Sequence, residues 1–223
     1  MKKIASVTPI RCRVVNSYKK LSGFSFLALF VVSACTSLPG GSGGQAALRH
    51  YLLTPSVAEG SHVDAIPAPG YALELLQVAL PPYLNRSQIV TRLGPNELHI
   101  SEAHQWGDTL AENITRTTAI NLSRLLGHDR VFPQSPRLLL PANLRLATEI
   151  NRFEQDADGH VVLDLVWRLF VVGEAVPALE RRASWTSEPV AATDYALVVA
   201  AMSRLLGDFS ASVAQEVTKL RRP

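Results

Sequence analysis

Two long segments of alternating apolar and polar residues constrain the fold more than any other feature of this sequence. Within residues 143–154, Leu144, Leu146, Thr148 and Ile150 alternate with Arg145, Ala147, Glu149 and Asn151, and residues 161–172 show a similar alternation. A period of two is typical of a strand with one face in the core. Residues 155–159 between them are polar and end in a glycine, which favours a tight turn. The two segments therefore predict an antiparallel hairpin at the centre of a sheet.

Shorter strand-like segments are expected to extend this hairpin. A second hairpin is predicted from residues 87–92 and 97–101, joined by the turn-forming residues 93–96. The apolar positions of residues 71–80 change phase, so either both faces of that strand are covered or a bulge re-aims it. Further short strands are predicted at residues 49–54, 130–132 and 182–187.

Two amphipathic helices are expected to cover the sheet. Apolar residues recur at steps of three or four between Ser101, a predicted N-cap, and Gly127, a predicted C′ residue. A second helix is predicted from its cap Thr193 to Leu220, about 40 Å long. That length leaves two possibilities: the helix packs wholly on its own sheet, or part of it meets a partner. The predicted fold class is α+β, a two-layer domain with a mostly antiparallel sheet and both main helices on one face.

The N-terminal region predicts export and attachment to a lipid. Six Lys and Arg residues and no acidic residue precede residues 21–34, an apolar run that closes with small residues, as in a signal peptide. Fourteen residues reach about 21 Å as a helix, which is short of a bilayer core of roughly 30 Å. The run leads into Val32-Ser33-Ala34-Cys35, which resembles the bacterial lipobox, where the cysteine is lipidated and becomes the first mature residue. The alternatives are an ordinary signal peptide that contains a cysteine, or a buried apolar helix.

This reading divides the chain into three parts. Residues 1–34 are the cleaved signal peptide, residues 35–48 are the lipidated Cys35 and a flexible Gly/Ser tether, and residues 49–223 are a single α+β periplasmic domain. Residues 36–47 would reach about 20 Å as a flexible coil. Residues 40–44 fit the pattern G-x-S-x-G of serine hydrolases, but that motif requires a strand before it and a helix after it. We therefore interpret Ser42 as part of the tether.

The charge of the mature chain argues against nucleic-acid binding. Six of the 22 Lys and Arg residues and none of the 19 Asp and Glu residues precede Cys35, so 16 basic residues remain against 19 acidic ones. A nucleic-acid-binding protein needs a cationic stripe, and only short pairs such as Arg181-Arg182 remain. The two cysteines are Cys12, which lies in the predicted signal peptide, and Cys35, so no disulfide framework is expected.

The polar residues of the domain do not predict an active site. His99, Glu102 and His104 form the closest group, but their spacing fits neither H-E-x-x-H nor H-x-x-E-H. We interpret them as surface residues, and we expect no catalytic residues, no metal site and no cofactor.

The most unusual stretch is residues 80–92, with the sequence LPPYLNRSQIVTR, which we call the signature segment. Read from its residues alone, it is a turn that returns a strand to the sheet. It also resembles the pattern L-P-x-Y-L-D-R-x-Q-I-V-x-R of the PqiC (YmbA) family of auxiliary lipoproteins, with Asn85 where the family usually has Asp. The resemblance is strong over residues 51–131, including the following residues: Tyr51, Leu52, Leu53, Asn96, Glu97, Leu98, Trp106, Leu110, Arg116, Asn121, Leu122, Leu125 and Leu126.

The resemblance implies a lipoprotein of the Gram-negative outer membrane that faces the periplasm. There it would be an accessory of an MCE-domain lipid-transport assembly, with an MCE-domain tunnel protein and its inner-membrane partner as partners. Thr36 after Cys35 fits release to the outer membrane under the sorting rule of enteric bacteria. The family also suggests a ring-shaped homo-oligomer that grips the tip of the tunnel, and we expect Tyr83, Leu84, Arg86 and Gln88 to be the docking residues. The alternatives are an assembly factor for another outer-membrane or cell-wall machine and a periplasmic hydrolase.

Overall fold

The computed structural model describes residues 47–61, 72–135 and 140–220. They belong to a compact unit that begins at Gly44. The predicted signal peptide, Cys35 and most of the predicted tether, including Ser42, lie outside the described residues.

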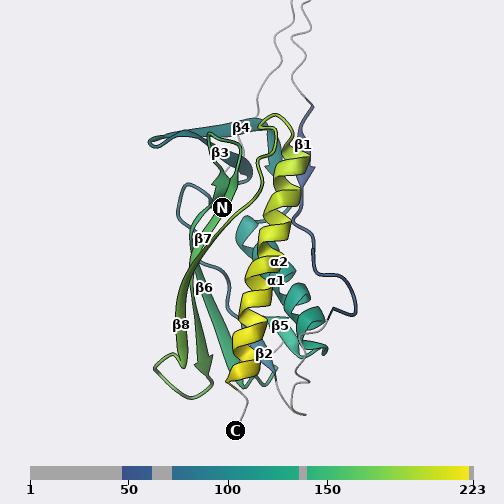
Figure 1. The fold of residues 1–223 in the computed structure, drawn as a ribbon, viewed down its shortest axis with the longest axis vertical. Coiled ribbons are helices and arrows are strands. Elements are labelled where there is room, and N and C mark those ends of the chain that lie inside the picture. The colour runs from purple at the N-terminus through teal and green to yellow at the C-terminus, as the bar shows by residue number, and fades with distance from the viewer. Residues whose placement is uncertain (1–46, 62–71, 136–139, 221–223) are drawn as a thin grey trace, which may run out of the picture. The chain divides into compact units, whose positions relative to one another are not determined.

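The centre of the domain is an antiparallel meander of three strands (Figure 1). Strand β6 (Leu144–Gln155) pairs with β7 (Val161–Val171), and β7 pairs with β8 (Leu179–Thr186). The turn between β6 and β7 contains Gly159 at a φ of 89°, a conformation that favours glycine. The hairpin predicted from the alternating segments is therefore confirmed.

On its other edge, β6 pairs with a single stretch of chain that runs from β2 through Ala79 to β3. Strand β2 (Leu73–Leu75) runs parallel to the start of β6 and also pairs with β5 (Val131–Pro133). Beyond β2 the pairing is irregular, since Leu76 N donates to Leu146 O and only Ala79 forms a further bridge, with Glu149. This irregular path is the physical basis of the phase change in residues 71–80.

The chain then enters the second predicted hairpin. Strand β3 (Gln88–Gly94) touches the end of β6 and pairs antiparallel with β4 (Glu97–Trp106), which in turn pairs in parallel with β1 (Arg49–Tyr51). Among the described residues, eight strands form one curled mixed sheet, in which the long pairings are antiparallel and the short ones parallel.

The first helix begins later than the sequence predicts. Helix α1 (Leu110–Leu126) has Thr109 at its N-cap, so the prediction of Ser101 as the cap is wrong, and Trp106 belongs to β4. The reason is long-range: β1 pairs with residues 104–106 and keeps them extended. The other end agrees with the prediction, because Gly127 has a φ of 70° and its N–H donates to Ser123 O.

The second helix, α2 (Tyr195–Lys219), is capped one residue later than predicted. The Asp194 carboxylate, not Thr193, accepts hydrogen bonds from Ala196 N and Leu197 N at 3.1 Å each. Both helices lie on the same face of the sheet (Figure 1), which confirms the α+β class.

Buried positions recur along α2 from Tyr195 to Val217, and Phe209 packs edge-on against Trp167 of β7 and Trp185 of β8. By length and composition alone α2 could cross a bilayer, but most of its apolar stretch is buried inside the domain. Of the two possibilities left open by its length, packing within the domain, against the sheet and α1, accounts for most of the helix.

Candidate functional site

The signature segment forms a loop that leaves the edge of β6 and returns to it as β3. Leu84 N donates to Pro81 O and Arg86 N donates to Leu84 O, so the loop turns tightly around Leu84. Leu84 itself is only 2% exposed and belongs to the hydrophobic core. The loop is therefore pinned to the domain at its centre.

A buried carboxylate holds the two ends of the segment together. The Tyr83 hydroxyl donates to Glu154 Oε2 at 2.8 Å, and Arg92 Nε donates to Glu154 Oε1 at 3.0 Å. Arg152 Nε also donates to Oε1 at 3.0 Å, and Phe153 N donates to Oε2 at 3.0 Å. The Glu154 side chain is fully buried. Four donors thus satisfy both of its oxygens, as a buried charge requires.

A bulge in β6 explains the position of Glu154. The register of β6 against β7 shifts between Ile150 and Arg152. Up to Ile150 every second residue of β6 is buried, and after the shift the next buried residue is Phe153, three positions later. Because side chains alternate across a strand, Arg152 and Glu154 then share the face opposite to Phe153. On that face Tyr83 and Arg92 donate their hydrogen bonds to the Glu154 carboxylate.

The cluster changes the acidity of Tyr83 and Arg92. Burial and the nearby Glu154 carboxylate raise the pKa of Tyr83 to about 12. The hydrogen bond to Glu154 raises the pKa of Arg92 above its ordinary value. Both groups hold their protons more firmly than usual, and the carboxylate has no free oxygen to act as a base. We conclude that this cluster, which we call the Glu154 clamp, positions the loop.

The predicted docking residues differ in what they can offer a partner. Tyr83, Arg86 and Gln88 are half-buried, whereas Leu84 lies in the core. Arg86 Nε is buried and makes no hydrogen bond within the described ranges. The outer surface of the loop also includes three exposed residues: Pro82, Asn85 and Ser87.

The histidines predicted to be surface residues include one with a defined role in packing. His104 Nδ1 forms a hydrogen bond of 2.8 Å with the Tyr51 hydroxyl. The His104 ring also stacks on the Tyr195 ring, with the two centroids 4.0 Å apart. This contact joins β1, β4 and the start of α2. In the part of the chain that the structure describes, no group of His, Cys, Asp and Glu residues is arranged to hold a metal ion.

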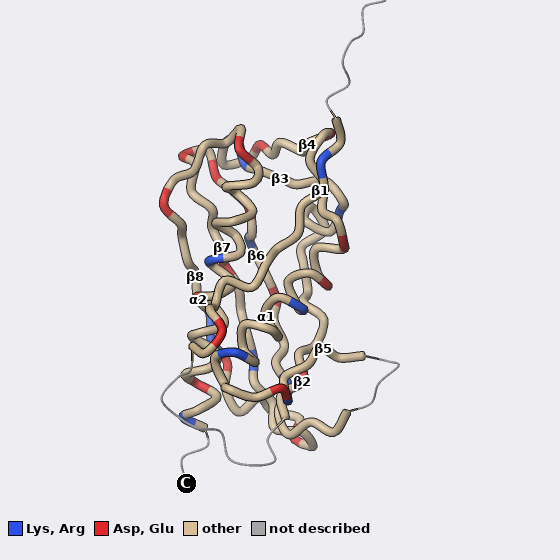
Figure 2. Tube along the Cα trace, turned by 90° about the vertical axis from the view of Figure 1, so that its right-hand side faces the viewer, with Lys and Arg blue, Asp and Glu red and all other residues tan. Residues whose placement is uncertain are grey.

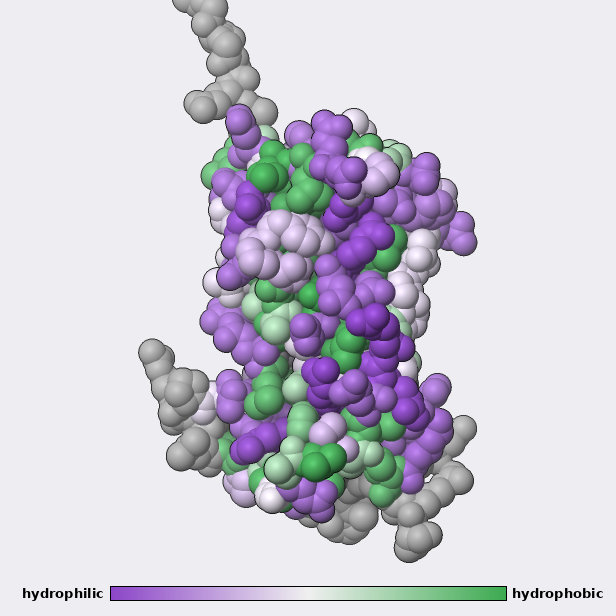
Figure 3. Space-filling view, turned by 90° about the vertical axis from the view of Figure 1, so that its left-hand side faces the viewer, coloured by the Kyte–Doolittle hydropathy of each residue, from purple (hydrophilic) through white to green (hydrophobic). Residues whose placement is uncertain are grey.

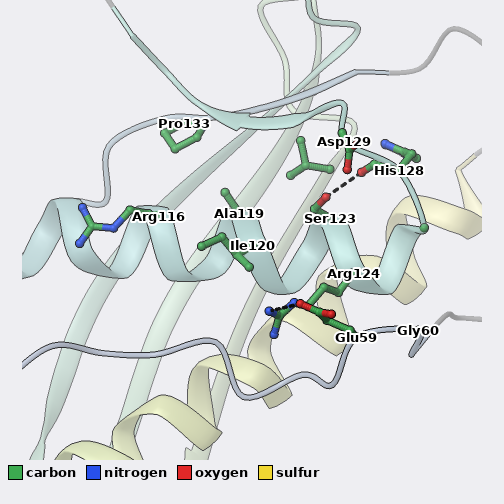
Figure 4. Close-up of a pocket in the computed structure, with 12 residues that line it drawn as sticks. Glu59, Gly60, Arg116, Ala119, Ile120, Ser123, Arg124, His128, Asp129 and Pro133 are labelled. Atoms are coloured by element: carbon green, nitrogen blue, oxygen red, sulfur yellow. Dashed lines mark hydrogen bonds and ion pairs between the residues drawn. The ribbon is translucent and has the colours of Figure 1, made fainter.

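An open groove of about 620 Å³ lies along the outer side of α1 (Figure 4). Ala119 and Ile120 line it between Arg116 and Arg124. The two arginines are engaged: Arg116 pairs with Asp108 at 2.8 Å, and Arg124 pairs with Glu59 at 3.3 Å. These pairs are structural contacts of the groove wall and do not resemble a catalytic arrangement.

Charges are interspersed over the described domain. Figure 2 shows Lys and Arg residues next to Asp and Glu residues along the trace, without a cationic stripe. Figure 3 shows that hydrophilic residues cover much of the face beside β8, with small groups of apolar residues among them. The exposed residues of β8 include Glu180, Arg181 and Arg182, which discourage pairing of this strand with other sheet edges.

Comparison with known proteins decides the family. The sequence profile of the family described as "ABC-type transport auxiliary lipoprotein component" matches residues 51–214, which is most of the chain. The chain belongs to this family. The family is one of accessory lipoproteins of transport rather than a class of enzymes, and the resemblance seen in the signature segment is confirmed.

Solved structures share the fold of this auxiliary lipoprotein. It is similar to protein XCC0632 from Xanthomonas campestris, with a TM-score of 0.63 and 18% identity over 77% of this chain and 97% of that chain. It is also similar to a protein described only as uncharacterized, with a TM-score of 0.58 and 22% identity over 72% of this chain and 99% of that one. The comparison with curated protein sequences gives no match.

Glu154 is the important residue that sequence reasoning missed. The segment 143–154 ends in a glutamate, and polar residues are common where a strand meets a turn, so nothing local distinguished it. The available signal was the pair Tyr83 and Arg92 in the signature segment, a hydroxyl and a guanidinium that both suit a carboxylate.

Proposed function

We propose that this protein is an outer-membrane-anchored periplasmic lipoprotein that docks onto an MCE-type intermembrane lipid-transport complex. The observation that carries the proposal is the signature segment itself. The Glu154 clamp holds its loop rigidly at the rim of the domain, and its tip carries the exposed residues Pro82, Asn85 and Ser87. A rigid, partly polar loop is suited to recognition, because little conformational entropy is lost when it binds.

The anchor is the second part of the proposal. Acyl chains on Cys35 hold the protein in the outer membrane after residues 1–34 are removed, and residues 35–48 form the tether. Residues 49–223 then work as one periplasmic domain at a short distance from the membrane. Cys35→Ala should give a folded but unlipidated protein, since the domain does not include the cysteine.

The docking surface is the third part. Tyr83, Arg86 and Gln88 contact the MCE-domain tunnel protein directly, and Leu84 contributes by pinning the loop from the core. Several copies around one tunnel tip form a ring-shaped homo-oligomer, and the inner-membrane partner of the tunnel protein completes the assembly. Each loop then contributes a small contact, and the copies together give avidity.

The proposal is tested by affinity purification of the lipidated protein from crosslinked membranes, with lipid analysis of the eluate. We expect an MCE-domain protein and its inner-membrane partner to co-purify. The double variant Asn85→Ala, Arg86→Ala should reduce the amount of MCE-domain protein that co-purifies, without changing the fold. The control is Ile120→Ala, which alters an exposed position on α1 outside the loop. Recovery of an outer-membrane or cell-wall assembly machine without any MCE-domain protein would count against the proposal.

A further inference from the structure

The first part of the domain after the tether lies against the two helices with little buried surface. Residues 49–61, which we call the strap, comprise β1 and the ten residues that follow it. Leu53 is the only buried residue of the strap; Tyr51, Pro55 and Val57 are half-buried, and the others are exposed. Figure 1 shows the strap running from β1 down beside α1 and α2. The strap therefore contributes few apolar contacts to the domain.

Side chains of the helices, rather than a neighbouring strand, hold the backbone of the strap after β1. Leu53 N donates to Asn113 Oδ1 at 3.0 Å, and Thr117 Oγ1 donates to Leu53 O at 3.4 Å. Thr54 N donates to Ser203 Oγ of α2 at 3.2 Å. After β1, no backbone group of the strap bonds to the backbone of any other segment that the structure describes. β1 itself adds only three residue pairs with β4.

A second attachment of the same kind lies further along α1. Val57 N donates to Asn121 Oδ1 at 3.3 Å, and Arg124 Nη1 donates to Val57 O at 2.7 Å. Leu53 and Val57 would be about 13 Å apart in an extended chain, and Asn113 and Asn121 would be about 12 Å apart along a helix. Because the two spacings match, α1 binds the strap backbone at two points. Side-chain hydrogen bonds therefore supply most of the attachment.

The attached strap leaves buried polar groups without partners. Asn113 is 1% exposed and Asn121 is 0% exposed, and the Nδ2 atom of each is buried without a hydrogen bond in the described ranges. A buried donor without an acceptor costs free energy, and water would satisfy both amides once the strap moved away. Open grooves of about 620 and 670 Å³ flank the strap, the first lined by Glu59 and the second by Ser56. Detachment of the strap is therefore less costly than that of a segment held by apolar packing.

We propose that the strap is a latch, which detaches from α1 and α2 as one unit while the helices and strands β6 to β8 stay folded. Segments with few buried contacts open locally at a lower free energy than the core. In the lipidated protein the latch lies between the anchor and the rest of the domain. Its release adds thirteen residues to the tether, about 45 Å when straight. Release also frees the domain to turn, so that its docking loop meets a partner further from the membrane.

A disulfide that holds the latch closed tests this inference. A Cβ at Gly207 of α2 would lie 3.5 Å from Ser56 Cβ, a separation that suits a disulfide. The double variant Ser56→Cys, Gly207→Cys therefore locks the strap when oxidised, and the same protein with reductant is the matched control. The mature chain has no other free thiol, because Cys12 is removed and Cys35 is acylated. The test uses the full lipidated protein in vesicles of phosphatidylethanolamine and phosphatidylglycerol.

Hydrogen exchange followed by mass spectrometry measures the opening. In the wild type we expect the amides of residues 49–57 to exchange together, at least about 100-fold faster than the amides of β6 and β7. The disulfide should slow all of them roughly 30-fold or more, including those of β1, and reductant should reverse the effect. Asn121→Ala removes the acceptor of Val57 N and should speed exchange of the strap about fivefold. Its control is Asn151→Ala, which removes a hydrogen bond to Asp164 of β7 and should leave the strap unchanged.

Two outcomes separate the possible failures. Exchange in residues 49–57 as slow as in β6 and β7, or exchange at β1 that the disulfide does not slow, would overturn the latch and leave the proposed function standing. The gain in tether length rests on the lipid anchor of the proposed function. An intact mass without acyl chains would contradict that anchor and, with it, this role of the latch.

Discussion

Replacing Tyr83 by phenylalanine tests the Glu154 clamp with the smallest possible change. The substitution removes one hydroxyl that donates to a fully buried carboxylate at 2.8 Å and keeps the ring. A hydrogen bond to a charged group contributes about 1.5–3 kcal/mol. We therefore expect the free energy of unfolding at neutral pH to fall by about 2 kcal/mol. Urea denaturation measures it, and the slope with denaturant should not change, because the folded surface stays the same.

The pH dependence gives an independent check on the same bond. The pKa of Tyr83 is about 12 in the folded protein against 10.0 in an ordinary tyrosine, so the unfolded chain loses this proton first as the pH rises. The contribution of Tyr83 is fully present below pH 10 and is lost as the pH rises through 12. Because Tyr83 is only partly buried, solvent screening keeps the loss below the roughly 1.4 kcal/mol per pH unit of an unscreened group. The difference in stability between the wild type and Tyr83→Phe should therefore become smaller between pH 10 and pH 12.

The control is Tyr195→Phe, which removes a hydroxyl that takes no part in the Glu154 clamp. Its stability difference from the wild type should not follow the same course with pH. The reasoning is refuted if Tyr83→Phe costs less than about 0.5 kcal/mol, the level of an ordinary surface substitution, or if its difference from the wild type is constant through the alkaline window.

Three further substitutions test other parts of the account. Arg92→Met should cost about 3 kcal/mol in urea denaturation, because it removes one of the two guanidinium groups that face buried Glu154; a cost near zero would contradict the clamp. Gly159→Ala should cost about 1–3 kcal/mol, since its φ is 89° and a Cβ would lie 3.0 Å from Val190 O; a neutral result would show that this turn is not constrained. Asp194→Ala should cost about 1 kcal/mol and speed amide exchange in the first turn of α2, whereas Thr193→Ala should change neither.

The sequence predicted those parts of the fold whose signal is local. The hairpin of β6 and β7 follows from strict alternation over two long segments, and Gly159 and Gly127 lie where a left-handed conformation is needed. The buried face of α2 follows from the spacing of its apolar residues at steps of three or four. Each of these features depends on residues within one or two turns or along one strand.

The errors arose where distant segments decide the structure. Trp106 continues the helical spacing of α1, yet it is extended, because Tyr51 pairs with it from far along the chain. The position of Glu154 depends on a bulge in β6 and on Tyr83, 71 residues away. Leu84 was expected at a docking surface, but the turn around it directs its side chain into the core. The pattern of apolar residues within one segment does not predict these three features.

The central claim is that the loop of the signature segment docks onto an MCE-domain protein, and site-specific photocrosslinking in intact cells tests it most directly. A photoreactive residue at the exposed position Asn85 should form an adduct with an MCE-domain protein, and one at Ile120 on α1 should not. The adduct should disappear in Cys35→Ala, since the protein then lacks the acyl chains that hold it in the outer membrane. Adducts from position 85 that contain only other outer-membrane or cell-wall proteins would contradict the account.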